Sequence, residues 1–269
     1  MKPLFDNSND LSSLTQIDRR FFLKLTSLLS LTAFAPSVLA LGNTSKIDLP
    51  QLIYSGGNWQ PRPTALRRLA WETQKRTSAK MVLEPSSIKP FLSKLALNPL
   101  SYISGDRAFT PFDKKTLANL KRYLHLGGTV IIDPAYTPDG ETDKFITIIN
   151  TMIKTLFNNK EPVKITSDHV IFNSFYKLNR PEGMRKGSPW LTGYNIGDRT
   201  AVIMSDHDLG GAYAMDNLGN WKNDISPGGF RQRENAFRLG VNLIMYALCG
   251  DYKTETSHKH FLLSDKQGQ

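Results

Sequence analysis

Short apolar runs alternate with amphipathic stretches along most of this chain, and this alternation constrains the fold more than any other feature. A strand buried on both faces reads as a continuous apolar run, whereas a helix that covers a sheet repeats apolar residues every three or four positions. Strands that alternate with helices of roughly 10–16 residues form an open, mainly parallel sheet with helices on both faces. We therefore expect one α/β domain.

The clearest local signals lie between residues 110 and 134. Thr110-Pro111-Phe112-Asp113 supplies a cap, a first-turn proline and an acidic third position, which predicts the start of a helix. Leucines follow at helical spacing until Gly127-Gly128 ends the helix. The apolar run 129–132 then predicts a buried strand, which Asp133-Pro134 terminates.

Similar patterns predict the remaining elements. Residues 207–230 are rich in Gly, Asn and Asp, which is typical of a loop. Further strands are predicted at 52–54, 81–83, 102–104, 163–165, 190–192 and 200–204, and further helices after Pro63 and at 88–95, 143–157 and 233–248.

The N-terminal segment resembles a twin-arginine export signal. Arg19-Arg20 is followed by Phe22-Leu23-Lys24 and an apolar run to Leu39, although Asp18 replaces the usual Ser or Thr. An apolar run of about 15 residues is shorter than the roughly 20 that span a bilayer, so a membrane anchor is the weaker alternative. We expect cleavage after Ala40 and a periplasmic protein; an uncleaved signal would leave an anchor.

The chain is thus divided into a signal peptide (1–40), an α/β domain (41–252) and a polar tail (253–269) that is predicted to be disordered. Its 34 Lys and Arg against 24 Asp and Glu give a net charge of +10, most of which lies outside the signal. This charge is compatible with an anionic partner but does not identify one, and we expect no nucleic-acid site. The single cysteine, Cys249, excludes an internal disulfide and is expected to be buried and inert.

Ligands bind to sheets of this kind at the carboxyl ends of the strands. That rule selects 55–59, 105–107, 133–136 and 206–208, which would line one crevice. Glycine amides in the first segment could bind an anion, but two glycines after a strand also form a plain turn. The tryptophan in that segment could stack on a ligand or cap the core. The candidate ligand-binding residues are Gly56, Gly57, Asn58, Trp59, Arg62, Asp106, Arg107, Asp206 and Asp208.

Two acidic and histidine-containing runs raise the question of a metal. Asp206-His207-Asp208 and Asp168-His169 offer ligand types, but neither has the His or Cys spacing of a zinc site. On a strand, Asp206 and Asp208 would share a face that His207 does not. The alternative is an Asp-rich loop that binds its own amides, and we predict neither a metal nor a cofactor.

Motifs for nucleophilic catalysis are weak. The chain contains no G-x-S-x-G elbow, and the S-x-x-K matches at Ser86/Lys89 and Ser174/Lys177 lack the companion motifs of penicillin-binding enzymes. Both matches are interpreted as chance.

Several segments together resemble the bacterial family called domain of unknown function 4159. The resemblance covers about residues 48–250 and implies a flavodoxin-like sheet of the class I glutamine-amidotransferase-like superfamily, but it brings no assigned activity. The segments that carry it are 54–66, 105–109, 127–133 (GGTVIID), 168–176 and 236–247.

That superfamily's amidotransferases carry a cysteine at a strand-to-helix elbow. The corresponding residues here are Asp133-Pro134-Ala135, so cysteine-dependent glutamine hydrolysis is not expected. Our leading hypothesis is a non-catalytic module that binds a ligand or protein partner at the strand ends. The alternative is a hydrolase that uses Asp133 with His169 or His207, with or without a metal.

Overall fold

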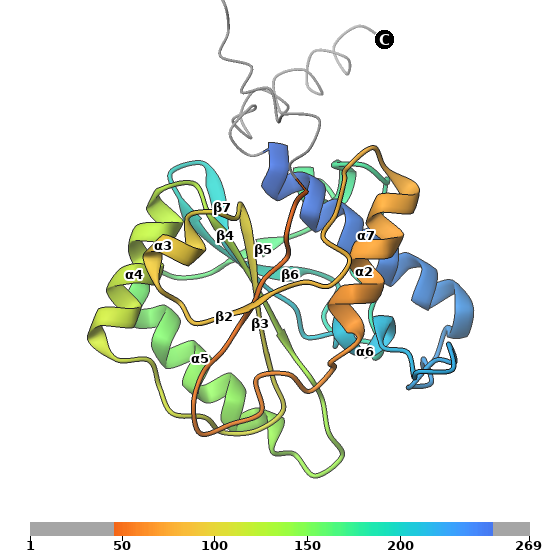
Figure 1. Ribbon diagram of the computed structural model, residues 1–269, viewed down its shortest axis with the longest axis horizontal. Coiled ribbons are helices and arrows are strands. Elements are labelled where there is room, and N and C mark those ends of the chain that lie inside the picture. Colours follow the sequence, from red (N-terminus) through yellow and green to blue (C-terminus); the bar gives the residue numbers. More distant parts are fainter. Residues whose placement is uncertain (1–45, 250–269) are drawn as a thin grey trace, which may run out of the picture. The chain divides into compact units, whose positions relative to one another are not determined.

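Strands β1 to β7 form one sheet in the computed structural model, which describes residues 46–249 (Figure 1). The spatial order is β2-β1-β3-β4-β7-β6-β5. The first five strands in this order are parallel to one another, and β6 runs antiparallel to both β7 and β5. The expected signal peptide and tail lie outside the described residues. The strands are β1 (Gln51–Leu52), β2 (Ser87–Ile88), β3 (Leu100–Gly105), β4 (Thr129–Pro134), β5 (Val163–Ile165), β6 (Leu191–Ile196) and β7 (Arg199–Met204).

Helices cover both faces of the sheet (Figure 1). Tyr102 and Ile131 pack into the core with α2, α6 and α7, whereas their neighbours Ile103 and Ile132 pack into the core with α4 and α5. Every residue of β3 and β4 is therefore buried, as a continuous apolar run predicts. The helices are α2 (Ala65–Arg76), α3 (Leu92–Leu95), α4 (Lys114–His125), α5 (Thr142–Leu156), the 3-10 turn η1 (Val170–Asn173), α6 (Leu209–Tyr213) and α7 (Gly229–Cys249).

This architecture confirms the expected flavodoxin-like α/β class, with a mainly parallel sheet between two helical layers. The strands expected at 102–104, 129–132 and 200–204 are β3, β4 and β7, each slightly longer than predicted. The helices expected at 143–157 and 233–248 are α5 and α7.

Two predictions in the first third of the chain are wrong. Residues 81–83 form no strand; Met81 makes only an isolated bridge to Ile47. The helix expected at 88–95 is reduced to α3, and its first residue belongs instead to β2. Pro90 explains the difference, because the residue before a proline is driven out of the helical region and into extended geometry.

The start of α4 also differs from the prediction. Asp113, and not Thr110, is the capping residue, and its carboxylate accepts the amide of Thr116 at 2.7 Å. The Thr110 amide donates instead to the carbonyl of Ser55 at 2.8 Å. Thr110 therefore ties the loop after β1 to the segment after β3.

The predicted loop at 207–230 contains the short helix α6 and a bridge between Met215 and Trp221. A helix of five residues has no stability of its own, so local patterns do not reveal it. Tertiary contacts from neighbouring strands hold α6, as described below.

The strand order reverses between β1 and β3. The connection from β1 to β2 runs through α2 on one face, and the connection from β3 to β4 runs through α4 on the other (Figure 1). Such a switch point separates the loops at the carboxyl ends of the two strands and is where open α/β sheets bind ligands. Within residues 46–249, the helices are too short or too polar to cross a bilayer.

Candidate functional site

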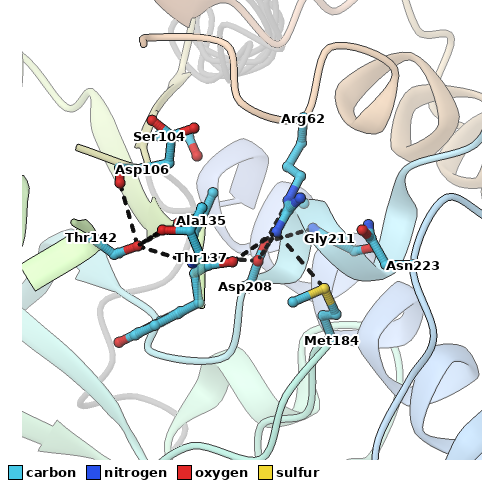
Figure 2. Close-up of polar contacts among 12 residues, drawn as sticks. Arg62, Ser104, Asp106, Ala135, Thr137, Thr142, Met184, Asp208, Gly211 and Asn223 are labelled. Atoms are coloured by element: carbon cyan, nitrogen blue, oxygen red, sulfur yellow. Dashed lines mark hydrogen bonds and ion pairs between the residues drawn. The ribbon is translucent and has the colours of Figure 1, made fainter. Parts of the chain in front are cut away.

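The loops after β1, β3, β4 and β7 meet at one edge of the sheet. Asn58 Nδ2, after β1, donates to Asp106 Oδ2, after β3, at 2.7 Å. Arg62 contacts Asp208, after β7, and the amide of Tyr136, after β4, donates to that same carboxylate at 3.0 Å. Figure 2 shows Arg62 reaching across to Asp208. The four segments predicted from the strand-end rule therefore do lie together.

Asp133 is the penultimate residue of β4 and is completely buried. Its Oδ1 accepts the amide of Leu209 at 2.9 Å, and its Oδ2 accepts the amide of Gly210 at 2.8 Å and the hydroxyl of Tyr102 at 2.5 Å. Burial, and after it the charge of Asp208, raises the pKa of Asp133 to about 7, although these three donors act in the opposite direction. The carboxylate thus anchors the start of α6 and is fully engaged by the protein.

Asp208 precedes α6 in the left-handed conformation, with φ of 51°. Its Oδ1 accepts the amide of Gly211 at 2.7 Å, and its Oδ2 lies 2.5 Å from Nη2 of Arg62. Burial alone would lower the pKa of Arg62, but Asp208 and Asp133 outweigh burial and raise it. One guanidinium therefore compensates two buried carboxylates.

Two glycines allow this close arrangement. A Cβ on Gly211 would lie 2.7 Å from both Asp208 Oδ1 and Met184 Sδ, and a Cβ on Gly210 would lie 3.0 Å from the Tyr102 hydroxyl oxygen. Side chains at these positions would separate the amides from the carboxylates that accept them. The run 206–211 (DHDLGG) thus begins a helix because contacts with neighbouring segments stabilise it.

His207 is fully buried beside this arrangement. Its Nδ1 lies 2.9 Å from Asp206 Oδ1, and its Nε2 has no hydrogen-bond partner among residues 46–249. Burial alone would raise the pKa of Asp206, but the His207 contact and two bonds from Ser188 outweigh burial and lower it. Asp206 Oδ1, like His207 Nε2, is buried without a hydrogen-bond partner among the described residues.

A cavity of about 140 Å³ adjoins His207. Three cationic residues line it, Arg180, Arg185 and Lys186, against one carboxylate, Glu182, which accepts a bond of 2.8 Å from Asn235. The Nε of Arg180 is buried without a partner among the described residues. Pro181, His207, Pro227, Gly228 and Gln232 complete the lining.

The wall of this cavity is fixed by the segment that precedes β6. The amide of Arg185 donates to the carbonyl of His207 at 3.1 Å, and Gln232 Nε2 donates to the carbonyl of Gly183 at 2.8 Å. A Cβ on Gly183 would lie only 2.3 Å from the His207 carbonyl oxygen. A glycine is therefore required where this segment crosses His207.

A model of a protein family described as a domain of unknown function (DUF4159) matches residues 48–248. The chain belongs to the DUF4159 family. The match confirms the family expected from the sequence and includes Asp133, His207 and every residue of the cavity wall. No curated protein matches the chain.

His169 lies at the opposite end of the sheet of this DUF4159 domain. Its Nε2 is 3.3 Å from the hydroxyl oxygen of Thr200, near the start of β7. Because Ile132 of β4 pairs with Met204 of β7, Asp133 lies about five strand positions, or roughly 16 Å, beyond Thr200. The structure thus brings Asp133 and His207 to one edge but does not bring His169 there.

The glycine loop after β1 serves packing in this DUF4159 domain. Gly56 has φ of 77°, and a Cβ there would lie 2.3 Å from the Thr110 hydroxyl oxygen. A Cβ on Gly57 would lie 2.6 Å from that of Phe109, and Trp59 is partly buried against the core. These contacts favour the turn interpretation and the core-capping role of the tryptophan.

The polar residues next to this loop bind one another. Asp106 is almost entirely buried, and its carboxylate accepts from Asn58 and from Nε of Arg107, the latter at 2.8 Å. The Arg107 side chain is largely exposed. The pair therefore closes the loop, with only the arginine available to solvent.

Two expectations for the DUF4159 domain are wrong. Asp206 and Asp208 do not share a face, because Asp206 contacts Ser188 and His207 whereas Asp208 contacts Arg62. Cys249, expected to be buried, is exposed at the end of α7. Within residues 46–249, no three His, Cys, Asp or Glu residues gather into a group that could hold a metal ion.

Sequence reasoning missed the cavity wall between residues 180 and 186. This segment belongs to no helix or strand, so neither periodicity nor the strand-end rule selects it. Its composition was the available signal, since RPEGMRK gathers three basic residues with a proline and a glycine.

Proposed function

We propose that this DUF4159 domain is a non-catalytic module that binds a ligand in the cavity beside His207. One contrast carries the proposal: Asp133 is buried and fully engaged, whereas His207 keeps an unpartnered nitrogen and lines a cavity. That cavity adjoins the carboxyl end of β7 through His207, and none of its lining residues belongs to the loops after β1 and β3 at the switch point.

We also propose that the domain belongs to the class I glutamine-amidotransferase-like superfamily, as the resemblance implies, but that it does not hydrolyse glutamine. The carboxyl end of β4 carries the carboxylate of Asp133, and the only cysteine, Cys249, ends α7. A thiol nucleophile at the elbow is therefore missing from the sequence itself.

The competing function is a hydrolase in which His207 acts as a general base. Asp206 beside Nδ1 and a buried, unpartnered Nε2 match an arrangement in which a carboxylate orients the base. Asp133 would then contribute only indirectly, because its oxygens are occupied by protein donors.

A hydrolase screen separates these functions. The purified protein would first be analysed for bound metal and then assayed on phosphate esters, carboxylic esters and glycosides. The same assays would be run on His207→Gln, on Asp133→Asn and on the control Lys115→Gln, at an exposed position of α4. We expect no turnover in any sample. Turnover that Lys115→Gln retains and His207→Gln or Asp133→Asn loses would overturn the binding proposal.

A ligand screen tests the position of the site. Small molecules that raise the melting temperature of the native protein would be measured again with Lys186→Glu at the cavity and Lys115→Glu on α4. We expect the affinity for the ligand to fall in Lys186→Glu and to stay unchanged in Lys115→Glu. Equal losses in the two variants would place the ligand elsewhere.

We also propose that the protein is exported by the twin-arginine route and cleaved after Ala40. The paired arginines and the apolar run that follows support this localisation. N-terminal sequencing of periplasmic protein should then begin at Leu41, and an Arg19→Lys, Arg20→Lys double variant should remain in the cytoplasm. Export that survives this double substitution would contradict the route.

A further inference from the structure

Four large apolar side chains are exposed together where α2 and α7 cover one side of the sheet (Figure 1). Trp71 of α2 and Trp221, between α6 and α7, are each 38% exposed, and Phe230 in the first turn of α7 is 79% exposed. Leu218, in the turn before Trp221, is 88% exposed. Scattered exposed apolar residues are ordinary, but a group of them marks an interaction site. We call these four residues the tryptophan patch.

Arginine side chains join the members of this patch. The Arg68 guanidinium lies 4.3 Å from the ring centre of Trp71 and 5.6 Å from that of Trp221. The Arg233 guanidinium lies 4.2 Å from the Trp221 ring centre. Phe230 precedes Arg233 by three residues, so the two share a face of α7. Both tryptophans and Phe230 therefore belong to one continuous surface.

Leu218 belongs to the same surface because its turn is tied to Trp221. Met215 and Trp221 form an antiparallel bridge, and Leu218 lies in the turn between them. The Asp216 carboxylate accepts the amides of Leu218 at 2.9 Å and Asn220 at 2.8 Å. Leu218 thus projects from an ordered turn, with its Cα within roughly 11 Å of that of Trp221.

Basic residues predominate around the patch. The stretches that form this surface, 65–76, 215–224 and 229–238, carry eight Lys and Arg against four Asp and Glu. Two of the four acids, Glu72 and Glu234, are paired with arginines. Lys75, Lys222 and Arg231 are exposed and form no ion pair within residues 46–249. These three cations are available to an anionic partner.

The shape of the patch favours a membrane over a folded protein as that partner. Leu218 projects from a turn and Phe230 from the start of a helix, and a protein partner would need a recess to match each of them. The boundary between lipid headgroups and acyl chains accepts projecting apolar side chains without such recesses. Tryptophan is enriched at that boundary, and lysine and arginine are attracted to anionic headgroups.

We propose that the tryptophan patch docks the protein on the surface of a membrane that contains anionic phospholipid. Leu218 and Phe230 enter the interface, Trp71 and Trp221 lie at the level of the headgroups, and the three unpaired cations contact lipid phosphates. The contact is interfacial, because the helices within residues 46–249 cannot cross a bilayer. The proposal is independent of the cavity beside His207, because that cavity is lined by other residues.

Co-sedimentation with lipid vesicles tests the proposal. The protein, purified as the cell processes it, would be mixed with vesicles of phosphatidylcholine alone and with vesicles of equal parts phosphatidylcholine and phosphatidylglycerol. We expect binding to the anionic vesicles to be about tenfold tighter or more, and to weaken as salt is added. Failure to bind the anionic vesicles, or equal binding to both kinds, overturns the proposal.

A double variant tests the apolar part of the patch. Leu218→Ser, Phe230→Ser should weaken binding to the anionic vesicles about tenfold or more, because less apolar area enters the interface. The matched control is Leu97→Ser, Leu126→Ser, which changes two exposed leucines in the turn after α3 and at the end of α4. All four positions are exposed, so the variants should fold, which thermal unfolding checks. Equal losses in the two double variants overturn the proposal.

A second pair of variants tests the charged part. Lys222→Glu, Arg231→Glu should weaken binding to the anionic vesicles about tenfold or more. Lys114→Glu, Lys115→Glu changes the net charge equally on α4 and should have a much smaller effect. Every sample carries the same N-terminus, so a difference between variants reports on the patch. If both variants lose affinity equally, overall charge explains the binding and the patch does not.

Polyglutamate distinguishes a membrane from an acidic protein partner. A soluble acidic polymer offers charge but no apolar interior, so Leu218→Ser, Phe230→Ser should leave the affinity for it unchanged. If the protein binds polyglutamate and does not bind the anionic vesicles, an acidic protein replaces the membrane as the partner and the proposal is overturned.

Discussion

Asp133, near the end of β4, and Asp208, beyond the end of the neighbouring β7, together accept the first three amides of α6. Asp133 accepts from Leu209 and Gly210, and Asp208 accepts from Gly211. Two buried carboxylates thus hold a helix of five residues that is too short to persist alone. The same bonds remove these carboxylates from the groups that could act on a substrate.

Loss of Arg62 should destabilise the protein strongly. Arg62→Met leaves Asp208 buried without its ion-pair partner and Asp133 without a nearby positive charge. Breaking a buried pair on one side costs about 3–5 kcal/mol. Urea unfolding should show a decrease in the free energy of unfolding of that size.

Arg67→Met provides the matched control. Arg67 pairs with Glu84 at 3.4 Å, and both side chains are largely exposed. The expected change is within about 0.5 kcal/mol. Similar losses for the two arginine variants would show that the buried pair has no special weight.

The stability of the protein should carry a pH dependence from Asp133. Burial, and then the charge of Asp208, raises the pKa of Asp133 to about 7 in the folded state, against about 3.9 when unfolded. Between these values the folded state holds a proton that the unfolded state lacks, so this contribution is complete below pH of about 4 and is lost as the pH rises through about 7.

Asp133→Asn measures that contribution. Urea unfolding of the native protein and the variant would be compared at several pH values within this range. The stability of the native protein relative to Asp133→Asn should fall as the pH rises. A relative stability that stays constant or rises with pH would mean that the carboxylate is ionised throughout this range, with its three donors outweighing burial.

Alanine substitutions at the start of α6 should differ in cost. Gly211→Ala places a Cβ 2.7 Å from Asp208 Oδ1 and Met184 Sδ, so a loss of about 1–3 kcal/mol is expected. Gly210→Ala meets its nearest atom at 3.0 Å and should cost less. Thermal unfolding ranks the two, and the reverse order would contradict the described packing.

His169 should not influence the proposed site. It contacts Thr200 near the amino end of β7, whereas His207 lies beyond the carboxyl end of that strand. His169→Gln should leave the affinity for a ligand found in the screen unchanged in calorimetry while lowering stability modestly. A loss of affinity comparable to that of Lys186→Glu would show that the two ends are coupled.

The elements that the sequence predicted correctly are those long enough to show a continuous apolar run or a regular apolar stripe. β4 is recognisable because a strand that is buried on both faces is a continuous apolar run. α5 is recognisable from its apolar stripe. β2 and α3 were misplaced because they contain two and four residues, too few for a period to be measured.

The site was predicted in part for a similar reason. The strand-end rule found Asp133 and Asp208, because the end of a strand is visible in the sequence, and Arg62 was a candidate because it lies near the loop after β1. It could not show that Asp208 adopts a left-handed conformation or that its carboxylate faces Arg62. Those features depend on contacts between distant segments, as does the cavity formed by residues 180–186 and 227–232.

The bond between Arg62 and Asp208 joins residues 146 positions apart. During synthesis, a chain that has not yet reached β7 holds an arginine whose partner does not exist. The strand-end loops therefore take their final arrangement only after most of the domain has been made, and contacts of such long range form slowly. Under the proposed twin-arginine route, which carries folded proteins, export would follow the completion of these contacts.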